Sequence, residues 1–306
     1  MEQVTIEFHF PLWLVALLLF GALAVGVALT PWARRVFDGT PRGADKATGE
    51  AGDGSPDELT FDNPAHDFGS IAAPVVTITA LLLSFSLVNV WGSYADAAVK
   101  ANAEAVAVDY QSDMAHMIPD PVESQELEAV LVCYARSIAG PEWQAMSERG
   151  EATAAEVDDW TDRLQEIIGV LGTQKLGTSV VEREIIAADK ERATARSQRL
   201  TEARVSIPEP ITLLLLAAAA VSIIVLAFAY LPLRNRRLHV AALVVVTVMF
   251  IGLIQVITEL DSPYRGLIDI DATDMARVAT DEAADFAEQH PGVQLPCDDQ
   301  GRLIAN

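Results

Sequence analysis

Polar side chains recur at helical spacing through a long, mostly apolar stretch of the sequence, residues 71–117. Steps of three and four residues select one set: Thr79, Leu82, Ser86, Asn89, Ser93, Asp96, Lys100 and Glu104. On a helix these residues fall within an arc of roughly 100° on one side. Hydroxyl and amide groups on such an arc can hydrogen-bond neighbouring helices. They can also face a water-filled path for ions.

The sequence leaves both interpretations open. In the first, Thr79, Ser86 and Asn89 bond to other helices, a common use of such residues in membranes. In the second, copies of this face from several subunits line a pore, with Leu82 or Phe85 as an apolar constriction. The pore-lining candidates are then Thr79, Leu82, Phe85, Ser86, Asn89 and Ser93. The candidates for an outer mouth are Asp96, Lys100 and Glu104.

No arrangement typical of catalysis is present in the sequence. GxSxG, HExxH, CxxC and glycine-rich nucleotide loops are absent, and no two of the five histidines have metal-ligand spacing. His116, near Asp113, is either a pH-responsive contact or an ordinary solvated histidine. We therefore expect no enzyme activity, no metal site and no cofactor.

Four uncharged segments are long enough to cross a hydrocarbon core of about 30 Å, so the lipid bilayer is the first expected partner. They are residues 12–29, 72–90, 211–231 and 240–257. The connections after the first and third segments carry the basic residues Arg34, Arg35, Arg42, Lys46, Arg234, Arg236 and Arg237. The positive-inside rule places both connections in the cytoplasm. The N-terminus, residues 91–209 and the C-terminus are then extracytoplasmic.

The predicted fold class is an all-α membrane protein. Its four transmembrane helices join a helical extramembrane domain that is continuous with the second and third spans. We expect these parts: 1–33, N-terminus and first span; 34–70, cytoplasmic linker; 71–90, second span; 91–209, extracytoplasmic domain; 210–258, third and fourth spans; and 259–306, acidic tail. The 91–209 domain holds 22 acidic and 11 basic residues, and the whole chain has a net charge of −22. This charge argues against nucleic-acid binding.

Within the outer domain, Pro141 predicts a break after a helix over residues 122–138. The tail predicts an amphipathic helix over residues 272–290, with Met275, Val278, Ala279 and Phe286 as its packing side. Two cysteines, Cys133 and Cys297, are the only ones in the chain, and the predicted topology places both on the oxidising side. They predict one disulfide, with two free buried thiols as the alternative.

Several short motifs, in this order, resemble the bacterial bestrophin-like family of membrane proteins. They include Val90-Trp91-Gly92-Ser93-Tyr94, Arg199-Leu200 before Ile207-Pro208, and Leu260-Asp261-Ser262-Pro263-Tyr264-Arg265-Gly266. The resemblance implies a multi-pass protein of a bacterial cell membrane, related to bestrophins. Those are oligomeric, mostly pentameric, anion channels whose second transmembrane helix lines the pore around an apolar neck. By this likeness the pore positions are Leu82, Phe85, Ser86 and Asn89.

Taken together, these features predict an oligomeric ion channel, with copies of the chain and inorganic ions as partners. The outward orientation and the acidity of the large domain depart from the bestrophin pattern and put anion selectivity in doubt. The alternative function is a non-conducting membrane scaffold or sensor whose outer domain binds a partner or an envelope component.

Overall fold

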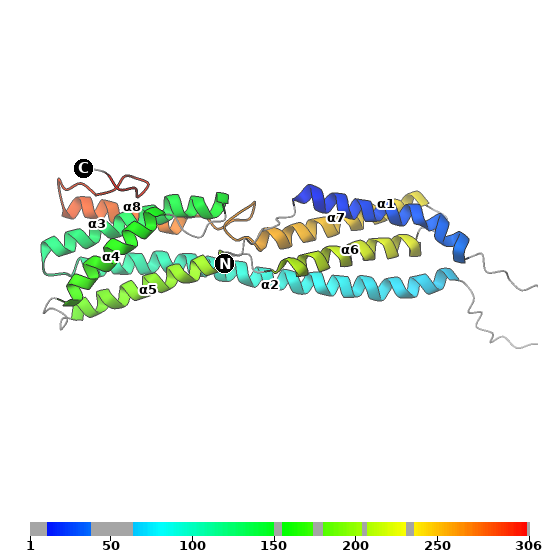
Figure 1. Cartoon of the computed structure of the whole chain (residues 1–306), viewed down its shortest axis with the longest axis horizontal. Helices are drawn as coiled ribbons and strands as arrows, with labels where there is room; N and C mark the ends of the chain where they lie inside the picture. Colours follow the sequence, from blue (N-terminus) through cyan, green and yellow to red (C-terminus); the bar gives the residue numbers. More distant parts are fainter. Residues whose placement is uncertain are drawn as a thin grey trace, which may run out of the picture. The chain divides into compact units, whose positions relative to one another are not determined.

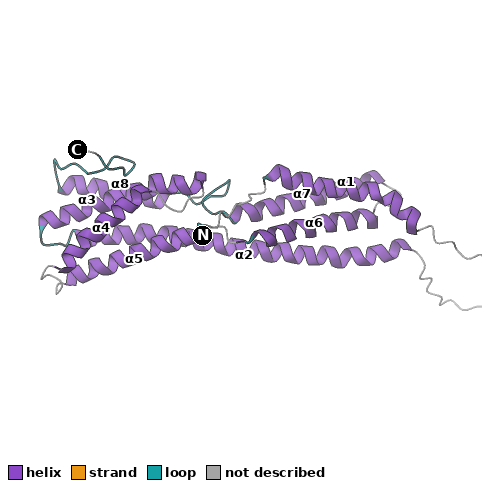
Figure 2. Cartoon of the chain, in the orientation of Figure 1, coloured by secondary structure: helices purple, strands orange, loops and turns teal. Residues whose placement is uncertain are grey.

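The computed structural model describes residues 11–37, 64–149, 155–173, 180–203, 207–230 and 236–304. Figure 2 shows that these residues are helical or in loops, and the one extended pairing among them joins Cys297 to Leu303. The helices are α1 (Leu12–Phe37), α2 (Pro64–Ala115), α3 (Pro121–Ser137), α4 (Ala155–Thr173), α5 (Val180–Glu202), α6 (Glu209–Tyr230), α7 (Arg236–Leu260) and α8 (Thr273–Gln289) (Figure 1). The all-α prediction is confirmed. Most of the predicted linker 34–70 lies outside the described residues.

The chain divides into two compact units. The first, which we call the membrane unit, comprises residues 1–87 and 207–257, and the second, the outer unit, comprises residues 88–206 and 258–306. Helix α2 contributes to both, because it runs from Pro64 to Ala115 as one helix. The predicted helix therefore does continue past the end of its apolar stretch.

The membrane unit holds α1, α6, α7 and the first part of α2. Among the described residues, four helical segments are long and apolar enough to cross a membrane: Leu12–Pro31, Ala72–Ala115, Glu209–Ala229 and Arg237–Leu260. Helix α1 packs closely on α6 at Gly26, where an added Cβ would come within 2.8 Å of the Ala227 Cβ. Small residues at such crossings let two helix backbones approach. Gly26 therefore sets the distance between α1 and α6.

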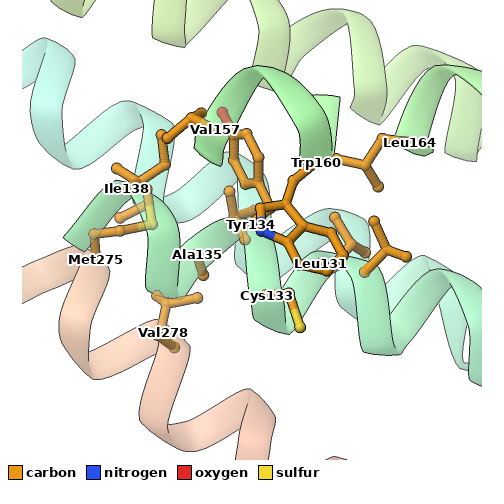
Figure 3. Packing of buried hydrophobic residues seen from close by; sticks show 14 of the residues in the cluster. Leu131, Cys133, Tyr134, Ala135, Ile138, Val157, Trp160, Leu164, Met275 and Val278 are labelled. Carbon is orange, nitrogen blue, oxygen red and sulfur yellow. The ribbon is translucent and has the colours of Figure 1, made fainter. Parts of the chain in front are cut away.

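Helix α3 is the centre of the outer unit. It packs against α4 on one side and α8 on another. The core around it joins Leu131, Tyr134 and Ile138 of α3 to Trp160 of α4 and Val278 of α8 (Figure 3). Helix α3 begins cleanly because the Asp120 carboxylate accepts from the Val122 amide at 2.8 Å and Pro121 occupies the first turn.

Pro141 was predicted to break the helix, and this prediction is wrong, because Pro141 lies inside a helical turn. The chain continues from α3 into two π-helical turns, η1 (Ile138–Glu142) and η2 (Ala145–Arg149). Proline lacks an N–H and its ring clashes with the carbonyl four residues earlier, and a widened turn accommodates both effects without ending the helix. One consequence is that the Glu142 side chain is fully buried.

The C-terminal tail is ordered on the outer unit. Helix α8 buries the four residues predicted as its packing side, Met275, Val278, Ala279 and Phe286. Beyond α8, Cys297 forms a disulfide with Cys133 of α3, so the predicted pair is the one observed.

Gly301 fixes the path of the tail after this disulfide. Its φ is +71°, and an added Cβ would lie 2.3 Å from the Ser137 amide nitrogen. Only glycine fits such a position without a backbone shift. The Gly301 carbonyl accepts from the Trp160 indole, which ties the tail to α4.

Candidate functional site

The predicted polar arc of α2 is divided between the surface and the interior of the chain. Its central residues are accessible: Leu82 and Asn89 are exposed and Ser86 and Ser93 are half-buried. Phe85, beside the arc, is 76% exposed. Among the mouth candidates, Asp96 is exposed, Lys100 is half-buried and Glu104 is buried. The pore-lining candidate Thr79, at the other end of the arc, is also buried.

Thr79 is used within the chain. Its hydroxyl lies 2.8 Å from the Ser222 hydroxyl of α6 and 3.4 Å from the Ala218 carbonyl oxygen. This is the helix-to-helix interpretation of the polar residues, and it applies to Thr79. The remaining accessible residues run from Leu82 to Lys100, and we call Leu82, Phe85, Ser86, Asn89 and Ser93 the α2 face.

The buried side of α2 explains this division. It is formed by Ala72, Leu83, Val90 and Ala97, whose spacings of eleven and seven residues bring them back to one side of the helix. On a helix the centre of this side lies about 70° from the centre of the predicted arc. The arc therefore borders the packed side: its near edge, with Thr79 and Glu104, is buried, and its far edge, with Asn89 and Asp96, is exposed.

Glu104, predicted as a mouth residue, lies in the core of the outer unit. It is fully buried, and its carboxylate accepts hydrogen bonds from the Tyr134 hydroxyl at 2.9 Å and from the Arg199 guanidinium. Arg199 of α5 also donates to Glu142 of the π-helical turn, and Arg196 donates to the other Glu142 oxygen at 2.6 Å. This buried network joins α2, α3, α5 and η1.

The buried opposite charges in this network stabilise one another. Burial disfavours a charged guanidinium, yet the adjacent Glu104 and Glu142 carboxylates raise the pKa of Arg199 above its ordinary value. Burial, together with the negative charge of Glu104, raises the pKa of the Tyr134 hydroxyl, so it stays protonated and able to donate. The network is therefore a permanent structural element at ordinary pH.

Sequence reasoning missed this network, although α5 carried a signal. The buried residues of α5 recur at steps of three and four, and they are Glu182, Ile185, Ala188, Arg192, Ala195 and Arg199. Charged residues at core positions of such a repeat require buried partners of opposite charge. Their identity, Glu104 and Glu142, depends on the fold, since the three residues are far apart in the chain.

No chemistry beyond ion pairing is evident in the part of the chain that the structure describes. There, no three histidine, cysteine, aspartate or glutamate side chains are grouped so that they could hold a metal ion. The α2 face is thus the feature that remains to be explained by function.

The chain is similar to bestrophins in sequence family and in fold. The family model described as "Bestrophin-like domain" matches residues 67–275, more than half of the chain. Among curated proteins, none matches.

Solved structures give the same fold. A bacterial bestrophin homolog from Klebsiella pneumoniae has a TM-score of 0.63 at 13% identity, over 92% of this chain and all of that one. A variant of that homolog scores 0.63 at 12% identity, over 90% of this chain and 98% of that one. A further structure, described as a membrane protein, scores 0.62 at 14% identity over 92% and 100%. The chain therefore belongs to the bestrophin-like domain family.

Proposed function

We propose that this protein is a homo-oligomeric ion channel in which copies of α2 line the pathway, five of them as in bestrophins. The observation that carries the proposal is the accessible α2 face, on a chain of bestrophin-like fold. Leu82 and Phe85 place apolar groups at one level of this face, and Ser86, Asn89 and Ser93 place polar groups from there outward. An apolar constriction next to hydroxyl and amide groups is an arrangement used for gating and conduction.

Asn89 supports an aqueous or protein-lined environment for this face. Its side chain is exposed on the single chain, and within the described residues no hydrogen-bond partner is recorded for it. A primary amide that faces hydrocarbon loses its hydrogen bonds with water and is costly. In an oligomer with the α2 face turned inward, Asn89 contacts water or another subunit instead.

The surface charge supports a preference for cations. Residues 91–209 carry twice as many acidic as basic side chains, 22 against 11. Acidic surface near a pore entrance raises the local concentration of cations and lowers that of anions. We therefore expect a reversal potential closer to the equilibrium potential of the cation than to that of the anion. This would contrast with the anion channels among the bestrophins.

A thiol-blocking experiment tests whether α2 lines the path. Both natural cysteines are in the disulfide, so Asn89→Cys introduces the one free thiol. We expect a cationic methanethiosulfonate reagent to abolish most ion flux through Asn89→Cys protein in liposomes, because it adds bulk and positive charge inside the path. The matched control is Leu214→Cys, exposed on α6, where the same reagent should leave flux unchanged. Equal sensitivity of the two variants, or insensitivity of both, would contradict the proposal.

We also propose that the outer unit is extracytoplasmic. Two features support this orientation: the basic connections after the first and third spans, and the Cys133–Cys297 disulfide, which is stable in oxidising compartments.

Cysteine labelling tests this orientation. Leu267, in the turn after α7, is 89% exposed. We expect Leu267→Cys to react with a membrane-impermeant maleimide on intact cells, and Lys46→Cys only after permeabilisation. The opposite labelling pattern would reverse the topology.

A further inference from the structure

Two histidines from different parts of the outer unit converge on one buried carboxylate. Glu128 of α3 is 2% exposed. His290, at the end of α8, places its Nε2 atom 2.9 Å from the Glu128 Oε2 atom. His116, just after α2, places its Nδ1 atom 2.9 Å from Oε1, although at an angle that does not make a hydrogen bond. The predicted neighbour of His116 was Asp113, and the observed one is Glu128.

The Ser124 hydroxyl links Glu128 to the end of α2. It lies 2.6 Å from Glu128 Oε1 and 2.9 Å from the Ala115 carbonyl oxygen. A hydroxyl has one proton to donate, and the Ala115 carbonyl also accepts from the Ile118 amide at 3.1 Å. The Ser124 proton is therefore available to the Glu128 carboxylate, and these contacts tie α3 to the end of α2.

A second buried carboxyl group lies beside this cluster. Glu282 of α8 accepts a hydrogen bond from the Ser112 hydroxyl of α2. Burial raises the pKa of Glu282 to about 6, with a smaller raising effect from Asp109 and Asp285 and lowering effects from Ser112 and His116. The groups around Glu282 thus come from α2, from α8 and from the residue after α2.

We propose that Ser112, His116, Ser124, Glu128, Glu282 and His290 form a clasp, with Glu282 as its proton-binding group, which holds α8 on α2 and α3 more tightly in acid than at neutral pH. The proposal concerns the docking of α8 alone and does not depend on ion conduction. Its two halves act together, because Glu282 and His290 both belong to the α8 segment and their partners belong to α2, α3 and the turn between them.

The sign of the pH dependence follows from Glu282. A carboxyl group whose pKa is higher in the folded than in the unfolded state stabilises the fold when the pH is below its pKa in the unfolded state. This contribution is lost as the pH rises through its pKa in the folded state. For Glu282 the window runs from the ordinary value of 4.5 to about 6. Docking of α8 is therefore tightest near pH 4.5 and weaker above pH 6.

Other contacts keep the tail in place when the clasp loosens. The disulfide at Cys297 anchors the chain beyond α8, and near the start of α8 Asp274 accepts from the Asn102 amide at 3.1 Å. The half of α8 between these anchors carries Glu282, Phe286 and the adjoining His290. Loosening is thus confined to this half, which is the part to monitor.

Hydrogen exchange of the full-length protein in detergent measures the clasp directly. With rates corrected for the intrinsic effect of pH, we expect amides of the C-terminal half of α8 to be about tenfold more protected at pH 5 than at pH 7.5, the factor for one pKa unit. Amides of α5 in the same unit serve as the internal reference and should not change. Parallel changes in α8 and α5, or no change in α8, overturn the proposal from the wild-type protein alone.

Variants assign the effect to its residues. Glu282→Gln mimics the protonated carboxyl, so its α8 protection at pH 7.5 should approach that of the wild-type protein at pH 5. Glu288→Gln, an exposed acid on the same helix, should keep the wild-type response. A wild-type pH response in the Glu282→Gln protein would overturn the assignment.

Discussion

Replacing both cysteines by serine is expected to lower the free energy of unfolding of the outer unit by about 2–5 kcal/mol. The disulfide joins Cys133 and Cys297, which are 164 residues apart in the sequence. A cross-link over so long a loop removes much of the conformational freedom of the unfolded chain, so its contribution lies toward the upper end of the usual range.

Other contacts should keep the tail folded when the disulfide is removed, so the lost stability is measured by unfolding. The tail near Cys297 is also held by Arg136, which donates to the Asp298 carbonyl at 3.2 Å, and by the Trp160 bond to Gly301. The folded tail should therefore stay in place in Cys133→Ser/Cys297→Ser protein at low temperature. Urea unfolding of the outer-unit signal measures the difference, and the wild-type protein under reducing conditions should match the variant. Equal stability with and without the disulfide would contradict this prediction.

The second large effect is expected at Arg199. Arg199→Met should destabilise the outer unit by about 3–5 kcal/mol, because it leaves the buried Glu104 and Glu142 carboxylates without their shared cation. Arg196 still reaches Glu142, so most of the uncompensated charge falls on Glu104. The measurement is again the free energy of unfolding from a urea titration.

Two further variants separate lost charge pairing from lost packing. Arg183→Met, exposed on the same helix α5, should change stability by less than about 0.5 kcal/mol. Adding Glu104→Gln to Arg199→Met should restore part of the loss, since a neutral amide needs no buried cation. If Glu104→Gln lowers the free energy of unfolding of the Arg199→Met protein by as much as it lowers that of the wild-type protein, the two residues are not coupled. That result would contradict the proposed role of the network.

Much of the fold could be predicted from the sequence because it depends on local pattern. The apolar segments, the periodicity of α8 and the breaker Ile118-Pro119 each act within a few turns of helix. The pairing of Cys133 with Cys297 followed from the predicted topology, which left both on one side of the membrane. Pro141 was misinterpreted, because local rules do not distinguish the end of a helix from a π-helical turn.

The candidate site was less predictable, because its residues depend on partners elsewhere. Thr79 and Asn89 both carry small polar side chains and lie on one predicted arc, yet Thr79 is buried against Ser222 while Asn89 is exposed. Glu104 was assigned to a mouth because it continues the polar arc of α2 beyond the apolar span. Only the position of Arg199, almost a hundred residues later, makes its burial possible. In the proposed oligomer, the surroundings of Phe85 also depend on the other copies of the chain.

The most direct test of the account is ion flux through the purified, correctly assembled protein in liposomes under potassium and chloride gradients. The account predicts flux with a cation-side reversal potential, and a higher flux in Phe85→Ala protein, because the variant removes an apolar ring from the path. Leu214→Ala, an exposed apolar change on α6, should behave as wild type. Absence of flux from the assembled oligomer at both acid and neutral pH would contradict the channel and favour a non-conducting scaffold.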